Sequence, residues 1–409
     1  MLISAYGCEP GKGSEQGVGW HWTMQLAHDS ELVVLTRSNN EEAIRGALPP
    51  EVADNVRFEF YDLPAAARKL KRKERGLYFF YLFWQWGAYR RARVLARQSR
   101  FDYAMHLTFG SIWMPTFMHL LPIPFIWGPV GGGEGVPFAL IRTLSVKGRA
   151  SQYLRYFLIA TIGLNPLLMG VIRRARLILA RTDETARLIP DAYSEKVRVV
   201  LETSMADDIL ASTMRTEARS NAPDLRVIYT GRLIPLKNLA LGIRAVAMAR
   251  RHGAGVRLTV VGDGPLRKSL EKLAHDEGIA EFVDFLGNMP QADVLASLRE
   301  SDAYLFPSLK EGGVWSLMEA MAASLPVVCV DGSGMSVITD ETCAIRVVPT
   351  SEEAMMQGFV DALLRLAESP QLRIQLGTNG RRRIEEQFRW EHKRQFMAAV
   401  FRDIEHVAE

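Results

Sequence analysis

The chain has only three cysteines, and they form no recognisable pattern. Cys8, Cys329 and Cys343 have neither the spacing of a zinc site nor the even number expected of a disulfide framework. Such cysteines are typical of a reducing compartment, where a buried thiol behaves as a small apolar side chain. The sequence therefore excludes a small disulfide-stapled domain and indicates a cytoplasmic protein.

Long hydrophobic runs are missing as well. Leu77–Tyr89 is thirteen residues without a charge, and residues 156–172 form a 17-residue run that contains Gly163, Pro166 and Gly170. A helix that crosses a bilayer needs about 20 apolar residues, and Pro166 ends or kinks a helix. The second run therefore predicts two helical pieces, buried or at a membrane interface.

Internal repeats, low-complexity tracts, a P-loop and a D-x-D motif are also absent. With 409 residues, 48% hydrophobic and 23% charged, the chain has the composition of a globular protein of two or three domains.

Strand-like segments alternate with helical ones along most of the chain. This alternation predicts α/β domains built on parallel sheets, with ligands at the carboxyl ends of the strands. The expected strands are Met1–Ala5, Leu32–Thr36, Val56–Tyr61, Tyr103–Leu107, Pro124–Trp127, Leu177–Ala180, Val197–Leu201, Leu225–Gly231, Arg257–Val261, Phe282–Gly287 and Asp302–Phe306.

Positive charge is concentrated in the first half. Residues 1–205 hold 26 Lys and Arg against 18 Asp and Glu, whereas the rest holds 24 against 28. Within residues 68–100, eleven basic residues and one acid, Glu74, surround the aromatic stretch Leu77–Tyr89. Such a segment predicts a helix that lies on an anionic membrane surface; the alternative is a buried helix with solvated basic ends. No nucleic-acid motif accompanies the charge, so no nucleic-acid partner is expected.

The most informative stretch is Phe306–Val328, FPSLKEGGVWSLMEAMAASLPVV. It predicts a strand, a loop with Gly312 and Gly313, and a helix. A helix N-terminus binds phosphate through its unpaired N–H groups, and Glu311 and Glu319 can accept hydrogen bonds from sugar hydroxyls. In the alternative, Ser316 and Glu319 form a capping box and Glu311 is a solvated loop residue.

Two further elements suit the same ligand. GRLIPLKN, residues 231–238, projects the cations Arg232 and Lys237 from one loop, and two cations fit a diphosphate. Residues 261–265, VGDGP, form a glycine turn with Pro265 at the start of the next helix.

Together these motifs resemble the donor site of glycosyltransferase family 4, the retaining nucleotide-sugar transferases of GT-B fold. The resemblance covers nearly the whole chain and is densest over residues 227–330. It implies GT-B architecture, with two Rossmann-like domains facing across a cleft. An acceptor-side domain is expected at 1–205, a nucleotide-sugar domain at 206–386, and a helix at 387–409 that crosses back to the first domain.

The resemblance also implies roles. Glu311 orients the transferred sugar, Glu319 binds the ribose hydroxyls, and Arg232 with Lys237 stabilises the departing diphosphate, so neither a metal nor a cofactor is expected. The base is expected at residues 287–290, whose backbone contacts do not separate uracil from guanine. The remaining donor-binding positions are Gly231, Gly262, Gly264, Gly312, Gly313, Val314, Ser316 and Leu317.

Three motifs of the first half are expected to serve the same reaction. The glycine-rich loop of residues 7–20, with Gly13 and Gly17, is predicted to face the donor phosphate, and an ordinary strand–helix connection is the alternative. His106 is predicted to contact the transferred sugar, although D-x-x-x-H departs from the family's D-x-x-H-x-H. Residues 127–135, WGPVGGGEG, are predicted to line the acceptor side through Gly131, Gly132 and Glu134, with a tight structural turn as the alternative.

The expected activity is retaining hexosyl transfer from a nucleotide-sugar to a hydroxyl of a glycan or lipid-linked acceptor in bacterial polysaccharide synthesis. The enzyme is expected at the inner face of the cytoplasmic membrane. A sugar-nucleotide epimerase, a phosphorylase or an inactive nucleotide-sugar-binding scaffold on the same fold remains an alternative.

Overall fold

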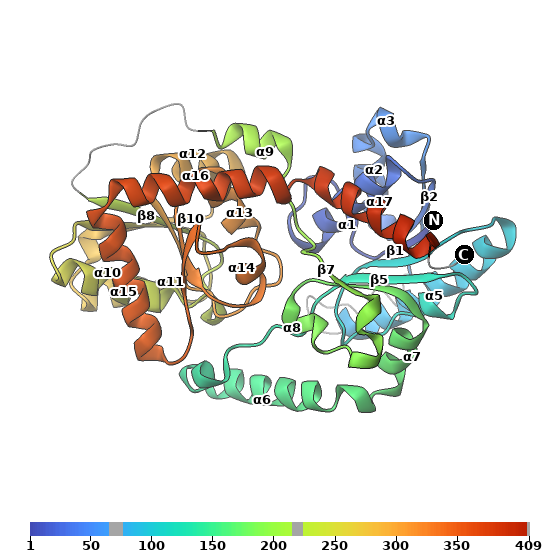
Figure 1. Ribbon diagram of the computed structural model, residues 1–409, viewed down its shortest axis with the longest axis horizontal. Coiled ribbons are helices and arrows are strands. Elements are labelled where there is room, and N and C mark those ends of the chain that lie inside the picture. Colours follow the sequence, from blue (N-terminus) through green and yellow to red (C-terminus); the bar gives the residue numbers. More distant parts are fainter. Residues whose placement is uncertain (65–76, 215–223, 407–409) are drawn as a thin grey trace. The chain divides into compact units, whose positions relative to one another are not determined.

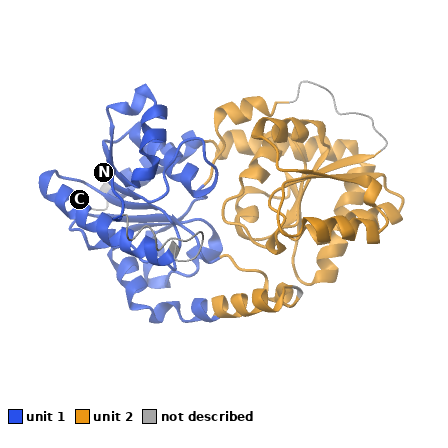
Figure 2. Ribbon diagram, turned by 180° about the vertical axis from the view of Figure 1, so that it is seen from behind, with its two compact units in different colours: residues 1–133, 157–202, 390–409 blue, residues 134–156, 203–389 orange. Residues whose placement is uncertain are grey.

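The computed structural model describes residues 1–64, 77–214 and 224–406. Its contacts divide the chain into two compact units (Figure 2). Unit 1 comprises residues 1–133, 157–202 and 390–409, and unit 2 comprises residues 134–156 and 203–389. Part of the basic segment (residues 68–76) and part of the expected interdomain linker (215–223) lie outside the described residues. Each unit is built on one sheet covered by helices (Figure 1).

The sheet of unit 1 has seven parallel strands in the order β3-β2-β1-β4-β5-β6-β7. Its central strands are buried along their length, as apolar strands covered on both faces should be. All seven expected strands are present, with ends shifted by a few residues. They are β1 Leu2–Ala5, β2 Leu32–Thr36, β3 Val56–Phe60, β4 Ala104–Thr108, β5 Phe125–Val130, β6 Ala175–Ala180 and β7 Val197–Val199.

The helices of unit 1 cover this sheet. The long helix α5 packs its Tyr89, Ala92 and Leu95 into the core beside strand residues of β1, β4 and β5. The last helix, α17, packs along α1, where the rings of His21 and Trp390 stack 4.8 Å apart. The helices are α1 Ser14–Ala27, α2 Glu41–Ala47, α3 Pro50–Ala53, α5 Leu77–Gln98, α7 Pro166–Arg174, α8 Asp183–Ala186 and α17 Trp390–His406.

The second apolar run is broken where the sequence predicts. Helix α6 (Val146–Ala160) is followed by a 3₁₀ turn, and α7 begins at Pro166. The side chain of Asn165 caps α7 by accepting hydrogen bonds from the N–H groups of Leu167 and Leu168. The prediction of two helical pieces is confirmed. No helix among the described residues has the length and apolar character needed to cross a bilayer.

Unit 2 has a six-stranded parallel sheet in the order β10-β9-β8-β11-β12-β13. Four strands were expected, and the last two are additional to the prediction. The strands are β8 Leu225–Thr230, β9 Val256–Val261, β10 Val283–Gly287, β11 Ala303–Phe306, β12 Val327–Val330 and β13 Ala344–Val347. Two parallel sheets with covering helices confirm the expected α/β class.

Helices of unit 2 connect the strands and pack on both faces of the sheet, with α10 against α15 and α13 against α16. They are α9 Asp207–Ser212, α10 Leu239–Arg251, α11 Arg267–Asp276, α12 Gln291–Glu300, α13 Trp315–Ala322, α14 Ser333–Ile338, α15 Glu352–Glu368 and α16 Pro370–Gln387.

One segment of the first half belongs to unit 2. Residues 134–156 include the 3₁₀ helix η3 (Phe138–Thr143), which contacts α15, and they bury Val136, Leu140 and Ile141. The observed units therefore differ from the expected 1–205 and 206–386, because this apolar segment finds its packing partners far along the chain.

Candidate active site

The catalytic and donor-binding residues expected in the second half gather at one edge of the sheet of unit 2. From β8 the chain adds β9 and β10 on one side, and from β11 it adds β12 and β13 on the other. The carboxyl ends of β8 and β11 are thus the point where the strand order reverses, which is where open α/β sheets bind ligands. Arg232 and Lys237 follow β8, whereas Glu311 follows β11.

Lys237 and Glu311 form an ion pair across this point. The Lys237 Nζ lies 2.6 Å from the Glu311 Oε1, and both side chains are about 15% exposed, at 16% and 15%. The ammonium also lies 5.3 Å from the centre of the Phe306 ring at the end of β11. A carboxylate and a cation are therefore held together at the strand ends, within reach of a bound polar ligand.

Arg232 lies in the same loop but is exposed. Its carbonyl accepts a hydrogen bond of 3.1 Å from the Tyr229 hydroxyl, which fixes the backbone. Among the described residues its guanidinium has no carboxylate partner, so its five N–H donors remain available to an anion.

The two glycine turns of the donor region pack backbone against backbone. A Cβ added to Gly262 would lie 2.1 Å from the carbonyl oxygen of Gly231, and one added to Gly264 would lie 2.5 Å from that of Leu233. The Leu233 N–H donates to the Asp263 carbonyl across the same contact. Glycine is thus needed here for the approach of the two loops.

Gly262→Ala tests this approach. Gly262 has φ +127°, so alanine adds about 1–3 kcal/mol of backbone strain to the steric conflict. We expect a lower melting temperature and weaker nucleotide binding than in the control Gly253→Ala, because Gly253 also has positive φ (+91°) but nothing within 4 Å of an added Cβ. Equal losses in thermal denaturation of the two variants would contradict the packing argument.

Helix α13 begins at Trp315 with Val314 at its N-cap and no side-chain cap. Ser316 is therefore inside the helix, and the capping box with Glu319 is not formed. The N–H groups of residues 313–316 have no acceptor among the described residues, as expected for an uncapped first turn. The preceding loop is fixed by the Gly334 N–H, which donates to the Glu311 carbonyl at 2.9 Å.

Glu319 lies one turn further along α13. Its Oε1 accepts a hydrogen bond of 2.9 Å from the Gln291 Nε2 at the start of α12. Burial raises the pKa of this carboxyl, because desolvation disfavours the charged form. The structure thus gives Glu319 an acceptor role toward a neighbouring amide.

The glycine-rich loop of unit 1 leads from β1 into α1. The Gly7 N–H donates to the Thr108 hydroxyl at the end of β4, and Gly17 is buried in α1, whereas Gly13 is exposed at its N-cap. β1 and β4 are the neighbours at which the strand order of this sheet reverses. The loop therefore lies at the corresponding edge of unit 1, and its phosphate contact stays a prediction.

His106 is buried rather than presented to solvent. Its side chain is 1% exposed, and its Nε2 lies 3.2 Å from the Tyr81 hydroxyl of α5. Burial lowers the pKa of His106 to about 4, so the ring is neutral at pH 7. A direct sugar contact of this ring stays a prediction that this packing does not favour.

The WGPVGGGEG motif is divided between the units. Gly131 and Gly132 belong to unit 1, where the Gly131 N–H donates to the Gly110 carbonyl. A Cβ at Gly133 would lie 2.3 Å from the Glu184 carbonyl oxygen, so this part is a tightly packed turn. Glu134 is buried in unit 2. That Gly131, Gly132 and Glu134 line the acceptor side stays a prediction.

Sequence reasoning missed an ionic cluster at the carboxyl edge of unit 1. The Arg181 guanidinium lies 2.6 Å from the Glu202 Oε2 and 3.7 Å from the Glu15 Oε1, which also accepts the Gly110 N–H at 2.8 Å. These residues are far apart in the sequence, and each taken alone resembles a surface charge. Only the sheet order, which aligns the ends of β1, β4, β6 and β7, brings them together.

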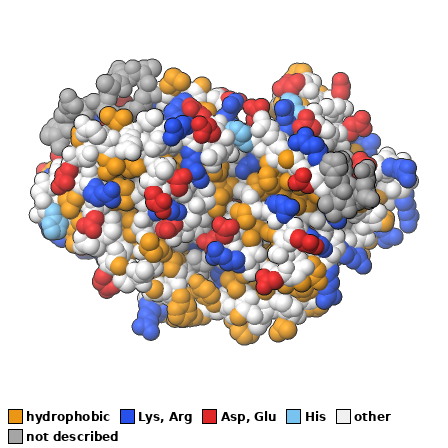
Figure 3. All heavy atoms as spheres, viewed as in Figure 1, with side chains coloured by type: hydrophobic (Ala, Val, Ile, Leu, Met, Phe, Trp, Pro, Cys, Tyr) orange, Lys and Arg blue, Asp and Glu red, His pale blue; other side chains and the backbone are white. Residues whose placement is uncertain are grey.

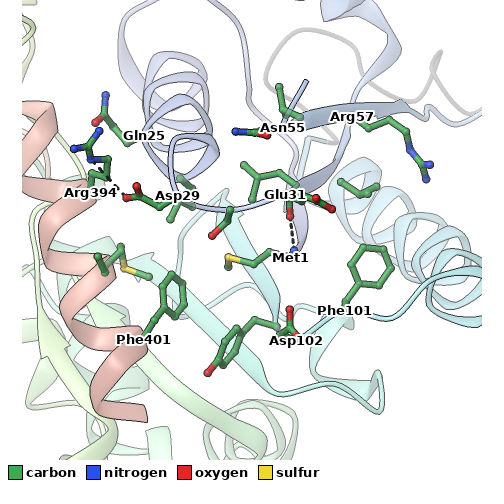
Figure 4. A pocket seen from close by; sticks show the side chains of 18 of the residues that line it. Met1, Gln25, Asp29, Glu31, Asn55, Arg57, Phe101, Asp102, Arg394 and Phe401 are labelled. Carbon is green, nitrogen blue, oxygen red and sulfur yellow. Dashed lines mark hydrogen bonds and ion pairs between the residues drawn. The ribbon is translucent and has the colours of Figure 1, made fainter. Parts of the chain in front are cut away.

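A large cavity lies at the opposite edge of the same sheet (Figure 4). It has a volume of about 1010 Å³ and is lined by the amino ends of β1 and β2 and by α17, including Asp29, Arg394 and Phe401. Parallel sheets bind ligands at the carboxyl ends of their strands, so this cavity is not the expected site.

Comparisons with known proteins agree with this geometry. The family described as "Glycosyl transferases group 1" matches residues 212–383. The amylovoran biosynthesis glycosyltransferase AmsK of Erwinia amylovora is 29% identical over 40% of this chain and 41% of its own length. A GDP-mannose-dependent phosphatidylinositol monomannoside mannosyltransferase of Mycobacterium tuberculosis is 27% identical over 40% of this chain and 44% of its own length. The chain thus matches less than half the length of these relatives.

Solved structures extend the likeness to the whole fold. Sucrose-phosphate synthase of Thermosynechococcus elongatus has a TM-score of 0.65 at 16% identity, covering 99% of both chains. HepE of Anabaena, solved in complex with UDP, has a TM-score of 0.63 at 14% identity, covering 98% of this chain and 99% of its own. The likeness to these chains shows the fold, which is GT-B. Residues 212–383, less than half of the chain, match the family of group 1 glycosyltransferases.

Proposed function

We propose that the protein is a retaining glycosyltransferase that moves a sugar from a nucleotide-diphosphate sugar to a hydroxyl group. The observation that carries the proposal is the meeting of Arg232, the Lys237–Glu311 ion pair and the uncapped N-terminus of α13 at the switch point of unit 2. Two cations and free helical N–H groups suit a diphosphate.

Each group has a distinct part in the proposed reaction. Arg232 and Lys237 neutralise the negative charge that grows on the departing diphosphate, which is the main help that such a reaction needs. Glu311, held by Lys237, accepts hydrogen bonds from the donor sugar and orients it. The N–H groups of residues 313–316 add to phosphate binding, and Glu319 exchanges its Gln291 partner for ribose hydroxyls.

The class of acceptor is proposed from the relatives and from the surface. AmsK is named for amylovoran synthesis and the mannosyltransferase for a phosphatidylinositol acceptor, and a lipid-linked glycan or polysaccharide precursor fits both. The name of AmsK gives no donor and that of the mannosyltransferase gives GDP-mannose. The base of the donor of this chain therefore stays open between uracil and guanine.

Transfer of radiolabelled sugar tests the activity. The purified protein is incubated with a panel of UDP-sugars and GDP-sugars and a membrane extract. Label from one donor should appear in a lipid-extractable or polymeric product, and not with Glu311→Ala. Turnover of the nucleotide-sugar without an acceptor would indicate an epimerase instead, and binding without turnover would indicate an inactive scaffold.

The surface of α5 favours peripheral membrane docking. Phe79, Phe83 and Trp86 are 69%, 58% and 48% exposed, and Arg90 and Arg97 continue the same helical face at intervals of three to four residues. The opposite face buries Phe80, Tyr81 and Trp84. An apolar half followed by a basic half suits insertion beside anionic lipid headgroups.

Helix α6 and the turn after it have a similar surface. Leu154, Phe157 and Leu164 are 59%, 64% and 82% exposed, and Figure 3 shows hydrophobic side chains along the lower edge, where α6 runs in Figure 1. Residues 135–182 contain eight basic residues and no acidic one. This sign of charge also favours an anionic membrane.

Vesicle sedimentation tests the docking. Replacing Arg90, Arg91, Arg93 and Arg97 by Gln should weaken binding to anionic vesicles, because each basic residue near the surface contributes about 1 kcal/mol, and it should leave donor binding unchanged. High salt should release part of the wild-type protein.

Controls separate the apolar and the electrostatic contributions. Replacing four cations of unit 2 by Gln should not change sedimentation of the protein with anionic vesicles. These cations are Arg244, Arg251, Lys272 and Arg382. Replacing Phe79, Phe83 and Trp86 by Ser should weaken sedimentation with anionic vesicles even at low salt. If the wild-type protein binds neutral and anionic vesicles equally, the electrostatic contribution to docking is contradicted. If it binds neither, the docking proposal fails and the acceptor is a soluble molecule rather than a lipid-linked one.

A further inference from the structure

The cavity at the amino edge of the sheet of unit 1 has no part in the proposed reaction (Figure 4). All its lining residues belong to unit 1, and they come from Met1, residues 25–33, 53–57 and 99–103, and helix α17. Its volume of about 1010 Å³ is at the upper end of the range for small-molecule sites, roughly 300–1,000 Å³. The cavity is therefore large enough for a ligand of several rings.

Aromatic rings form part of its wall. Phe101, Tyr103 and Phe401 are partly exposed, and the rings of Tyr103 and Phe401 lie 5.2 Å apart. The buried side chains of Leu26 and Met397 line the same cavity. Figure 4 shows Phe101 and Phe401 on opposite sides of it. A ligand with an apolar face can therefore pack against these rings.

Charged side chains of both signs surround the rings. Four carboxylates and four guanidiniums line the cavity. Asp29 and Arg394 lie 3.5 Å apart. Asp102 and Arg402 are exposed, and neither forms a hydrogen bond or a close ion pair with the described residues; Asp102 acts through its charge on the buried Met1 ammonium. The lining thus offers hydrogen-bond acceptors and donors in equal charge.

This balance favours a neutral ligand. A phosphate would meet carboxylates and a cation would meet guanidiniums, and a contact between like charges is costly. The Met1 ammonium is a further charge, but it donates to the Glu31 carbonyl at 2.6 Å. A hydroxyl group can donate to a carboxylate and accept from a guanidinium. A sugar carries such hydroxyls around a ring with apolar C–H faces, so balanced charges and aromatic rings fit a neutral carbohydrate.

We propose that this cavity is a second carbohydrate-binding site, which holds a neutral segment of a glycan while the reaction takes place elsewhere. Its role rests on the proposed function, because an enzyme that extends glycans can bind its own acceptor at two points. A segment held in the cavity raises the effective concentration of the acceptor without any new contact at the reacting end. A long glycan should therefore bind more tightly than a short one.

Oligosaccharide binding tests the site without any catalysis. Neutral tetrasaccharides of glucose, galactose and mannose, with tetragalacturonate as an acidic probe, are titrated into the purified protein by calorimetry. At least one neutral probe should bind and should slow hydrogen–deuterium exchange in residues 99–103 and 394–402. UDP and GDP should not displace it. Binding of no neutral probe, tighter binding of tetragalacturonate, or displacement by UDP or GDP would overturn the proposal.

Variants connect this binding to the lining residues. Asp102→Ala and Arg402→Ala should each lower the affinity for the bound tetrasaccharide about ten- to a hundredfold, because each removes a charged hydrogen-bond partner. Asp403→Ala, which is exposed on α17 but does not line the cavity, is the control. Melting curves identify a variant that fails to fold, and Asp102→Asn, which keeps an acceptor, should retain part of the affinity. Equal affinity of the two lining variants and the control would overturn the proposal.

Acceptor length gives a second readout. With the acceptor found by the transfer assay, Arg402→Ala should raise the KM for a long acceptor by a similar factor. It should leave kcat and the KM for a short acceptor unchanged, and equal changes for both acceptors would overturn the proposal. If the wild-type protein transfers no sugar, the proposed function fails, but tetrasaccharide binding still decides whether the cavity is a carbohydrate site.

Discussion

Replacing Lys237 or Arg232 by alanine should lower kcat by about a hundredfold to a thousandfold, with a smaller change in the KM for the donor. The loss of one preorganised group that stabilises developing charge has this size in other enzymes. Charge on the diphosphate grows as the sugar leaves, so a cation at this point acts more strongly on the transition state than on the bound donor. Steady-state kinetics with the identified donor measures both constants.

The ion pair between Lys237 and Glu311 provides a second test of the leaving-group role. Because Lys237 lies 2.6 Å from Glu311, removing one partner leaves the other without its counter-charge, and the double variant should cost less than the sum of the single ones. Lys272→Ala, on the exposed surface of α11, is the matched control. A change confined to KM would mean that the cations bind ground state and transition state alike, which would contradict the leaving-group role.

Much of the fold could be predicted because strand signals are local. The first sheet and β8 to β11 follow from short β-rich segments between helices, and their ends shift by only a few residues. The two missed strands, β12 and β13, have four residues each. Their apolar character alone did not separate them from the neighbouring helical segments.

The placement of the expected donor residues at one edge of the sheet could be predicted for a related reason. Arg232, Lys237 and Glu311 lie in loops that directly follow strands, and parallel strands bring such loops to one edge. The ion pair between Lys237 and Glu311 was not foreseen, because the pairing of β8 with β11 requires the sheet order.

The remaining features depend on contacts between distant residues. His106 is covered by Tyr81 of α5, which a strand-end position does not reveal. Residues 134–156 join unit 2, where η3 packs against α15. Neither contact follows from periodicity or from a local motif.

Replacing Glu319 by alanine should weaken donor binding by about ten- to a hundredfold. A hydrogen bond to a charged acceptor contributes roughly 1.5–3 kcal/mol, and the proposed site gives this carboxylate two ribose hydroxyls. Calorimetric titration with the donor measures the change, and Glu353→Ala, at the exposed first turn of α15, is the control. Unchanged affinity with an intact fold would leave Glu319 only its structural bond to Gln291.

The same carboxyl should make donor binding depend on pH. Burial raises the pKa of Glu319, so it takes up a proton at higher pH than an ordinary glutamate does and then loses acceptor capacity. Donor affinity should therefore fall as the solution is acidified, starting above the usual range of glutamate. Glu319→Gln should bind more weakly than wild type but should lose this pH dependence.

Photoaffinity labelling tests directly whether the nucleotide binds at the switch point of unit 2. Azido analogues of uridine and guanosine diphosphate are bound, irradiated and mapped by peptide sequencing, each with and without an excess of unmodified nucleotide. One analogue should label peptides within residues 262–291, around the glycine turn and the expected base loop, and the unmodified nucleotide should prevent this labelling. Competed labelling confined to unit 1, for example around the cavity that includes Asp29 and Arg394, would contradict binding at the switch point.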